Sequence, residues 1–398
     1  MAKKAIKSMT KVSDREYRLF RHLDVESKGT VLAESILEAL EMAGIAPGDK
    51  RIRDVVQGAK GLKAGTRLDP EAFCELIRPN IQVVEKAIQG QTVIPEFGTF
   101  TKEIDSIYEK TLGNNTGEVA NYIPQLGRVR PDQYGVSVCT IDGQRYAIGD
   151  HTTDFCVQSC SKPITYCLAL EEHGEEVVHK YIGREPSGRG FNELTLNHDG
   201  RPHNPMINSG AIMACSLIRP DLDIADRFDH VTEKWRALAG DQKIGFSNSV
   251  YLSERATADR NFALGYFMQE NKAFPEQADM IKTLEFYFQV CSLELNADKM
   301  SIIAGTLANG GVCPVTNKTI FNPKTVQNCL SLMYSCGMYD FSGEFAFTIG
   351  LPAKSGVAGA LMIVVPNVRG ICTWSPRLDA HGNSVRGIHF CRELVKAL

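Results

Sequence analysis

Apolar side chains between residues 14 and 95 recur every three to four positions, which is the spacing of amphipathic α-helices. Ser13, followed by acidic residues, predicts a capped start for the first of these helices. Breakers at 46–49 interrupt the pattern, and the helical spacing resumes after them. Beyond about residue 98 the spacing changes. We therefore predict an all-α N-terminal domain over residues 1–98 and a second domain over residues 99–398.

The segment that begins at Asp24 has the outline of an EF-hand calcium loop, with an acid at the first position and Gly29 at the sixth. Two ligand positions do not suit the ion. Lys28 occupies the fifth position, and Ser35 replaces the bidentate glutamate of the twelfth. We expect an EF-hand-like module that does not bind calcium and that serves either as a docking surface or as a packing appendage.

The second domain opens with the period of β-strands. Residues 135–149 alternate as two strands joined by the turn pair Asp142-Gly143, which predicts a hairpin. The apolar run 164–170 predicts a buried helix, and residues 385–398 predict a last helix packed across the sheet. Strands and helices in this arrangement predict an α+β domain, in which helices flank an antiparallel sheet.

Ser159 and Lys162 stand at the predicted start of the helix that follows the hairpin. They are three residues apart, so the lysine amine lies one turn above the hydroxyl on the same helix face. A lysine with a lowered pKa can take the proton of that hydroxyl and turn it into a nucleophile. Pro163 fits the first turn of a helix. Taken alone, the pair is more often a helix cap beside a surface lysine.

A second motif favours the catalytic interpretation. Lys354-Ser355-Gly356 precedes the apolar strand pattern of residues 358–365. Gly356 lets a substrate approach the backbone closely, and the next N–H, that of Val357, can complete an oxyanion hole. The two motifs follow one another as in the serine β-lactamases and penicillin-binding proteins, so we predict a catalytic domain of that kind.

Composition argues against several functions. The 44 basic and 47 acidic residues leave a net charge of −3, without the basic patch that nucleic-acid binding requires. No apolar stretch is long enough to span a bilayer. The nine histidines form no cluster, which argues against a catalytic metal. Twelve cysteines without a Cys-x-x-Cys pair indicate a reducing, intracellular compartment. The first residues show no recognisable targeting segment.

Two polar side chains outside these motifs have both a structural and a functional interpretation. Residues 117–126 predict a helix that ends at Pro124, and its Tyr122 is typical of a core tyrosine with a satisfied hydroxyl. Asn208 stands just before an apolar helix. It is either the N-cap of that helix or an amide that faces a substrate.

Glu254 and Asn261 are seven residues apart in a segment, 247–263, that predicts one capped helix. On such a helix they lie two turns apart on one face, with the small Ala258 between them. A carboxylate and an amide in this arrangement form either a pocket wall for an ammonium and a carboxylate or an ordinary solvated face.

Together these segments resemble the glutaminase family, specifically its larger kidney- and liver-type members. The similarity runs from about residue 93 to 393 and is densest at 335–343 and 350–359. The resemblance implies a β-lactamase-like domain that hydrolyses L-glutamine to L-glutamate and ammonia without a metal or other cofactor.

The same resemblance implies roles for matching residues. Ser159 would be the nucleophile and Lys162 its base, Tyr339 would assist proton transfer, and Tyr287 would line the site. The N–H groups of Ser159 and Val357 would form the oxyanion hole. The residues that bind substrate would be Tyr122, Ser159, Asn208, Glu254, Asn261, Tyr287, Tyr339 and Val357.

The resemblance also implies an assembly, a homotetramer able to grow into filaments, with the loop 183–196 near an interface and inorganic phosphate as an activator. Glu193 and Thr195 stand where kidney-type enzymes carry a lysine and a phenylalanine, and the reversed charge at Glu193 should weaken attraction for phosphate. The ankyrin repeats and transit peptide of larger relatives are not recognisable in this sequence. We expect a location in the mitochondrial matrix for a eukaryotic protein whose transit peptide is removed, and in the cytoplasm otherwise.

Two other functions fit parts of the sequence. A penicillin-recognising hydrolase shares both motifs, but a buried Glu254 would repel an acidic antibiotic. A non-catalytic scaffold that works through its N-terminal helices would leave the Ser159 and Lys354 motifs unexplained.

Overall fold

The computed structural model describes residues 12–397; Leu398 and the first eleven residues, including the start where no targeting segment is recognised, lie outside it. The chain divides into two compact units. The first runs to Thr101 and includes Asp142–Arg145, and the second comprises Lys102–Ile141 and the chain from Tyr146 onward.

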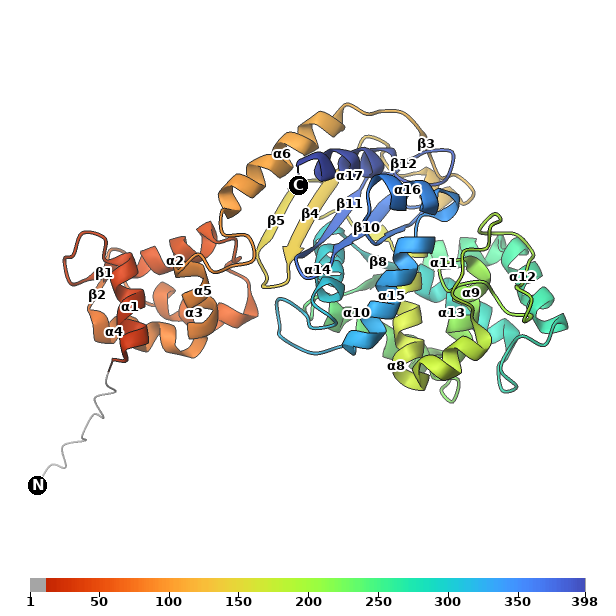
Figure 1. The fold of residues 1–398 in the computed structure, drawn as a ribbon, viewed down its shortest axis with the longest axis horizontal. Coiled ribbons are helices and arrows are strands. Elements are labelled where there is room, and N and C mark those ends of the chain that lie inside the picture. The colour runs from red at the N-terminus through yellow and green to blue at the C-terminus, as the bar shows by residue number, and fades with distance from the viewer. Residues whose placement is uncertain (1–11, 398) are drawn as a thin grey trace, which may run out of the picture. The chain divides into compact units, whose positions relative to one another are not determined.

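The first unit is a bundle of short helices (Figure 1). Its strand β1 (Val31–Leu32) pairs antiparallel with β2 (Arg67–Leu68), a pair that the sequence pattern does not predict because two residues are too few to show a period. The predicted cap at Ser13 is present as reciprocal hydrogen bonds with Glu16. The helices are α1 (Asp14–Leu23), α2 (Ala33–Met42), α3 (Arg53–Lys60), α4 (Pro70–Ile77) and α5 (Ile81–Ile88), with 3₁₀ turns at Lys50–Ile52 and Arg78–Asn80.

The loop that follows α1 is closed by its own first residue. The buried Asp24 carboxylate accepts the backbone N–H groups of Lys28 and Gly29 at 2.8 and 2.9 Å. Lys28 forms an exposed ion pair with Glu26. The carboxylate that would hold calcium therefore stabilises the turn by hydrogen bonds.

A five-stranded antiparallel sheet forms the centre of the second unit, in the order β5-β4-β11-β10-β9. The predicted hairpin is present as the first two strands in sequence, and the late strand β11 lies between β4 and β10. The strands are β4 (Gly135–Thr140), β5 (Arg145–Gly149), β9 (Ala353–Ser355), β10 (Ala360–Val365) and β11 (Arg369–Trp374). Helices and an antiparallel sheet share this unit, so the α+β prediction is confirmed.

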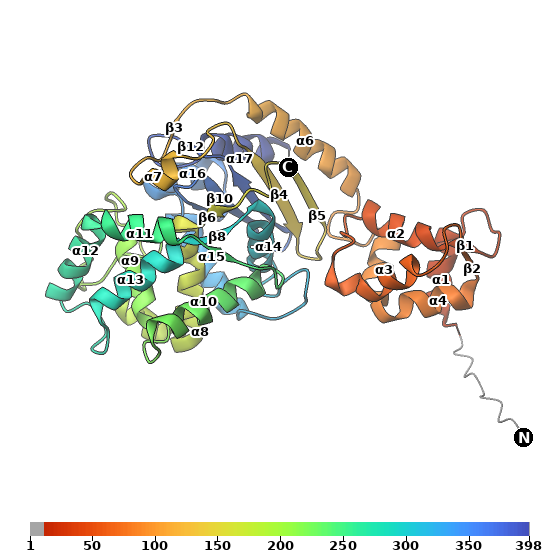
Figure 2. The ribbon, with the colours of Figure 1, turned by 180° about the vertical axis from the view of Figure 1, so that it is seen from behind.

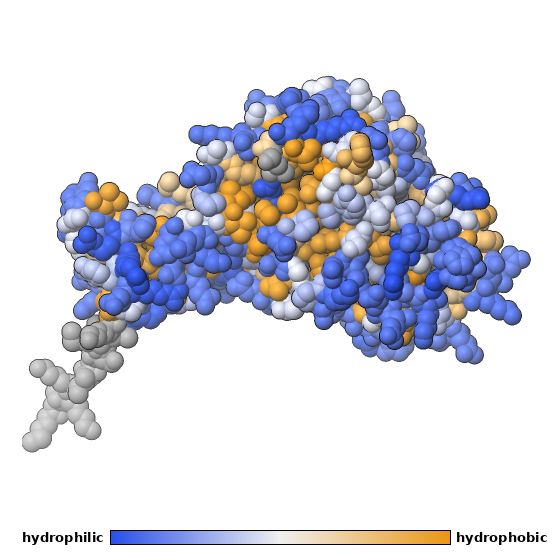
Figure 3. Space-filling model, in the orientation of Figure 1, coloured by the Kyte–Doolittle hydropathy of each residue, from blue (hydrophilic) through white to orange (hydrophobic). Residues whose placement is uncertain are grey.

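Helices cover both faces of the sheet. Helix α17 (Val385–Ala397) lies across one face beside α6 (Phe97–Leu112), and α14 (Ala297–Ala308) covers the other (Figures 1 and 2). Gly370 of β11 lets α14 approach closely, since a Cβ there would lie 2.0 Å from the Gly305 nitrogen. Figure 3 shows apolar side chains over β4 and β5. Four residues of the edge strand β5 are half-buried, and Gly149 is exposed.

The remaining helices of the second unit lie to one side of the sheet (Figure 1). Helix α8 carries a kink at Gly174, whose φ is 75°. These helices are α7 (Pro124–Gly127), α8 (Lys162–Tyr181), α9 (Asn208–Leu217), α10 (Ile224–Leu238), α11 (Asn248–Ala256), α12 (Asp259–Glu270), α13 (Met280–Cys291), α15 (Pro323–Cys336) and α16 (Ser342–Thr348), with 3₁₀ turns η3 (Gln158–Ser161) and η4 (Tyr339–Phe341). The short strands are β3 (Glu118–Val119), β6 (Phe155–Cys156), β7 (Gly245–Phe246), β8 (Leu293–Leu295) and β12 (Arg377–Leu378).

Two predicted helices are wrong. Residues 117–126 do not form a helix that ends at Pro124: β3 pairs with β12, and Pro124 begins α7, where its missing N–H costs no hydrogen bond. The predicted helix over 247–263 breaks at Thr257, after which α12 begins.

Within residues 12–397, no helix combines the length and apolar character needed to cross a bilayer. All twelve cysteines are free and buried.

Candidate active site

Ser159 and Lys162 meet where η3 runs into α8. The Lys162 Nζ lies 2.6 Å from the Ser159 Oγ, within hydrogen-bond distance. Lys162 is 2% exposed, and burial lowers the pKa of its amine because the charged form loses its hydration. The preceding Gln158 has a φ of 47°, which turns the chain sharply into the serine. The pair therefore has the geometry and the environment of a nucleophile with its base.

Tyr287 extends this pair into a line of polar side chains. The Lys162 Nζ donates to the Tyr287 hydroxyl at 3.4 Å, and that hydroxyl donates to the Asn208 Oδ1, also at 3.4 Å. Asn208 in turn donates through Nδ2 to the Asn261 Oδ1 at 3.2 Å. Asn208 is the first residue of α9, and the N-cap position belongs to Ile207. The amide of Asn208 thus faces the site and does not cap the helix.

Glu254 is the centre of a second group. Its Oε1 accepts the Tyr122 hydroxyl at 2.6 Å and the Gln158 Nε2 at 3.0 Å. Glu254 is buried, and burial raises the pKa of its carboxyl, although both hydrogen bonds and the nearby Lys162 oppose that shift. Tyr122 is 49% exposed as a whole residue, but its hydroxyl reaches the buried carboxylate. Tyr122 therefore lies at the exposed edge of this group of side chains and not in the core.

Tyr339 also lies beside the serine. Its φ is 54°, and its hydroxyl is buried without a hydrogen bond of good geometry among the described residues. Burial raises the pKa of Tyr339, and the neighbouring Ser159 hydroxyl and Val357 backbone lower it in part. The unsatisfied hydroxyl is poised to contact a substrate group between Ser159 and Val357.

Lys354 and Gly356 support this side of the site. The fully buried Lys354 Nζ donates to the Ser355 carbonyl at 2.7 Å and lies 4.5 Å from the centre of the Tyr339 ring. Burial and the nearby Lys162 lower the pKa of Lys354 to about 7. Gly356 packs on the nucleophile turn, since a Cβ there would lie 3.0 Å from the Val157 carbonyl oxygen. The Lys354 motif therefore lies against the Ser159 segment.

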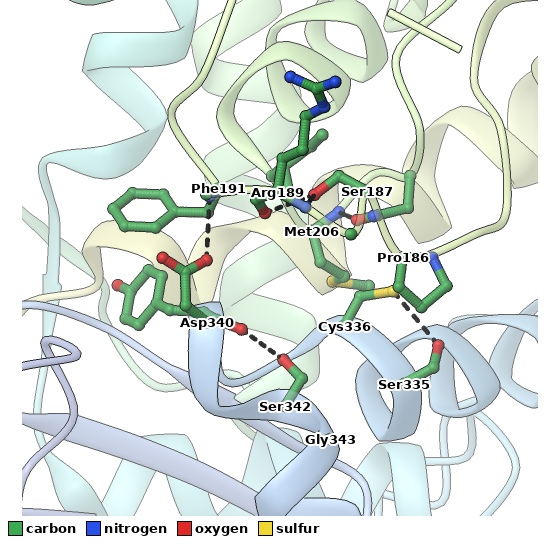
Figure 4. A pocket seen from close by; sticks show the side chains of 15 residues that line it. Pro186, Ser187, Arg189, Phe191, Met206, Ser335, Cys336, Asp340, Ser342 and Gly343 are labelled. Carbon is green, nitrogen blue, oxygen red and sulfur yellow. Dashed lines mark hydrogen bonds between the residues drawn. The ribbon is translucent and has the colours of Figure 1, made fainter. Parts of the chain in front are cut away.

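A cavity of about 510 Å³ opens beside Tyr339, between residues 186–191 and the segment 335–343 (Figure 4). The Phe191 N–H donates to the Asp340 carboxylate at 3.1 Å, and the rings of Phe191 and Tyr339 are 4.8 Å apart. The loop that contains Phe191 therefore borders the site.

All the predicted site residues lie in or beside these contacts: Tyr122, Ser159, Lys162, Asn208, Glu254, Asn261, Tyr287, Tyr339 and Val357. Glu254 and Asn261 do not lie on one helix face, because α11 ends at Ala256 and α12 starts at Asp259. They face the site from two helices.

Two polar neighbours of the site have no role in the sequence prediction. Gln158 contacts Glu254, and Asn192 accepts from the Asn208 Nδ2 at 3.1 Å. Gln158 directly precedes the predicted nucleophile, and this adjacency indicates that its side chain lies near the site. Nothing in the sequence around Asn192 indicates its contact with Asn208. Within residues 12–397 no cluster of His, Cys, Asp and Glu could hold a metal ion.

The fold and site correspond to a known class of proteins. Residues 117–398 match the family model described as glutaminase, and residues 15–95 match a model described as EF-hand domain. The chain therefore belongs to the glutaminase family.

Individual proteins described as glutaminases are also similar to this chain in sequence. The chain is 46% identical over 394 residues to putative glutaminase 2 of Caenorhabditis elegans. The aligned region covers 96% of this chain and 65% of that protein. It is 46% identical over 361 residues to the mitochondrial liver isoform of glutaminase of Mus musculus, which covers 90% of this chain and 60% of that protein. The chain thus spans less than two thirds of these curated relatives.

A solved structure described as Mglu in its glutamate form superposes with a TM-score of 0.70 and 35% identity, covering 73% of this chain and 67% of that one.

Proposed function

We propose that this protein hydrolyses L-glutamine to L-glutamate and ammonia through an acyl-enzyme on Ser159. The contact of 2.6 Å between Ser159 Oγ and a buried Lys162 carries this proposal, because a neutral amine at that distance can take the hydroxyl proton. Membership in the glutaminase family and the likeness to a glutamate-form structure support the choice of substrate.

The reaction has two halves. As Ser159 Oγ attacks the side-chain carboxamide, its proton passes to Lys162 and the carbonyl oxygen gains the negative charge. Collapse breaks the carbon–nitrogen bond, and the departing nitrogen takes a proton and leaves as ammonia. Water then attacks the ester, with Lys162 as base, and glutamate leaves as the proton returns to Ser159. The N–H groups of Ser159 and Val357 stabilise the oxyanion in both halves.

Substrate recognition depends on charge and on amide groups. Glu254, held by Tyr122, attracts the α-ammonium of glutamine. Asn261 holds the α-carboxylate through its amide nitrogen, and Asn208 positions the Asn261 side chain by a hydrogen bond, while Tyr287 lines the site beside Lys162. Tyr339, whose hydroxyl is buried near Ser159, assists proton transfer to the leaving nitrogen. Lys354, whose pKa is lowered to about 7, supplies a positive field when its amine is protonated and does not contact the substrate.

We propose the following properties for the protein as a whole. The catalytic domain, from residue 99, has a β-lactamase-like fold and needs no metal or organic cofactor, and inorganic phosphate acts as an activator. The protein forms homotetramers that extend into filaments. It works in the mitochondrial matrix if it is eukaryotic and loses a transit peptide, and in the cytoplasm otherwise. It requires neither nucleic acid nor a membrane.

Ammonia release from glutamine by purified protein tests the activity. Ser159→Ala should lower kcat by several orders of magnitude, since the members of a catalytic unit act together. Ser331→Ala is a matched control, because that exposed serine only donates to a carbonyl of its own helix. A chromogenic β-lactam should not be turned over. Undiminished ammonia release by Ser159→Ala would refute the mechanism.

A further inference from the structure

Asn192 lies in a segment without helix or strand between α8 and α9, yet its side chain reaches the site. Its Oδ1 accepts a hydrogen bond from the Asn208 Nδ2 at 3.1 Å. The same nitrogen donates to the Asn261 Oδ1 at 3.2 Å, so both N–H bonds of the Asn208 amide have an acceptor. Asn192 and Asn261 therefore fix which way this amide points.

The orientation of the Asn208 amide determines the direction of the hydrogen bonds beyond it. With its nitrogen held, Asn208 presents its oxygen to Tyr287, whose O–H donates to it. The Tyr287 hydroxyl has one proton, which it donates to Asn208. In its contact with Lys162, the Tyr287 oxygen must therefore be the acceptor. Lys162 thus donates to Tyr287, Tyr287 donates to Asn208, and Asn208 donates to Asn192. The lone pair of a neutral Lys162 consequently remains available for the Ser159 hydroxyl.

We propose that Asn192 is a positioning residue: it fixes the Asn208 amide, and through Tyr287 it keeps the Lys162 lone pair directed at Ser159. This inference rests on the proposed function and concerns how the base of that same site is kept ready. Asn192 contacts neither the nucleophile nor its base, and it acts through Asn208 and Tyr287.

Losing the Asn192 acceptor has a specific consequence. The Asn208 amide is then held by one partner and can rotate, which turns an N–H toward Tyr287. The Tyr287 proton must then find another acceptor. The Lys162 amine lies 3.4 Å away, and the neighbouring Cys291 thiol is only a weak acceptor. A hydrogen bond donated to that amine stabilises its neutral form and occupies the lone pair that Ser159 needs. The pKa of Lys162 falls, and the rate falls with it.

Other groups also set the charge state of Lys162, and they are the same in every variant below. They are Cys160 in its own turn, Cys215 of α9, Glu254 of α11, Tyr287 and Cys291 of α13, and Lys354 of β9.

The experiment compares three variants of the full chain by kcat and KM for glutamine across pH. Asn192→Ala removes the acceptor. Asn192→Asp keeps an acceptor of the same size. Leu194→Ala is the control in the same loop, since that side chain is 45% exposed. Thermal melting of each variant monitors folding. If the Tm of Asn192→Ala falls by more than about 5 °C, Asn192→Ser is used in its place.

For Asn192→Ala we expect a plateau kcat about tenfold lower, the usual effect of one lost hydrogen bond, and a smaller change in KM. The ascending limb of the pH profile should move to lower pH by about half a unit or more. Asn192→Asp should stay within about threefold of wild-type kcat, and its added negative charge moves the limb upward if at all. Leu194→Ala should match the wild type.

An unchanged plateau and limb in Asn192→Ala would overturn the inference, and so would an equal loss in Leu194→Ala or Asn192→Asp. A merely structural role would lower activity without moving the limb. If wild-type protein releases no ammonia from glutamine, the proposed function fails; if it is active and the variants behave alike, only the role of Asn192 fails.

Discussion

The Tyr122 hydroxyl donates to Glu254 at 2.6 Å, and Gln158 donates to the same carboxylate oxygen. Tyr122 precedes α7, whereas Glu254 lies on α11. This contact joins the exposed edge of the site to its buried negative charge. A ligand with a positive charge would find a carboxylate that is already oriented and partly desolvated.

Removing that charge should weaken substrate binding. We expect Glu254→Gln to raise KM for glutamine about 100-fold, because a charged hydrogen bond of roughly 2–3 kcal/mol is lost, with a smaller effect on kcat. Tyr122→Phe should raise KM about tenfold, through looser placement of the carboxylate. Steady-state kinetics of ammonia release measure both.

The pair Tyr251 and Glu285 supplies the control, since it has the same chemistry at 2.5 Å outside the site. Tyr251→Phe should leave KM unchanged. A KM for Glu254→Gln equal to that of the wild type would show that the carboxylate does not bind the ammonium.

The charge of Lys162 should shape the pH dependence. Burial lowers the pKa of its amine, and only the neutral amine can accept a proton, so kcat/KM should rise with pH as Lys162 deprotonates and then level off. Lys162→Arg should lose at least about a thousandfold in kcat, because a guanidinium stays charged at every accessible pH. The exposed Lys318, paired with Asp241, is the control position for the same substitution. A rate that falls as pH rises through this limb would contradict the role of the base.

Gly337 is a position where any side chain should destabilise the fold. A Cβ there would lie 1.8 Å from the Ala353 carbonyl oxygen, so α15 and β9 would have to separate. We expect Gly337→Ala to lower the free energy of unfolding by about 3 kcal/mol or more. A Cβ at Gly343 would meet open space, with nothing within 4 Å, and Gly343→Ala should be neutral or slightly stabilising. Chemical denaturation of both variants decides whether packing or backbone freedom matters.

The loop at Asp24 should not respond to calcium. Because its carboxylate holds the N–H groups of Lys28 and Gly29, neither calcium nor a chelator should shift the Tm. Asp24→Ala should destabilise the first unit by about 1–3 kcal/mol, since two N–H groups lose their acceptor. The exposed Glu26, replaced by alanine, is the control in the same loop. A saturable rise of the Tm with calcium would contradict this account.

Residue spacing in the sequence predicts those contacts of the site that form within one helical turn. Ser159 and Lys162 are one helical turn apart, so their contact follows once a helix begins there. The break between Glu254 and Asn261 could not be read from the sequence, because Ser247 to Ala263 has the composition of one capped helix. Only tertiary packing decides where that segment turns. The contact between Asn192 and Asn208 likewise depends on how a loop folds back over α9.

The position of β11 in the sheet has a consequence for how the protein is made. β4 is the second strand from the edge and is synthesised early, but its inner neighbour is β11, near the end of the chain. At the usual rate of translation the nascent hairpin waits on the order of tens of seconds before that neighbour leaves the ribosome. During this time one hydrogen-bonding edge of β4 has no partner strand. Val136 and Val138, which are fully buried in the folded protein, then lack the cover that β11 and the later helices provide. We expect newborn chains to depend on a chaperone that shields this hairpin, and chains that terminate before β11 to aggregate.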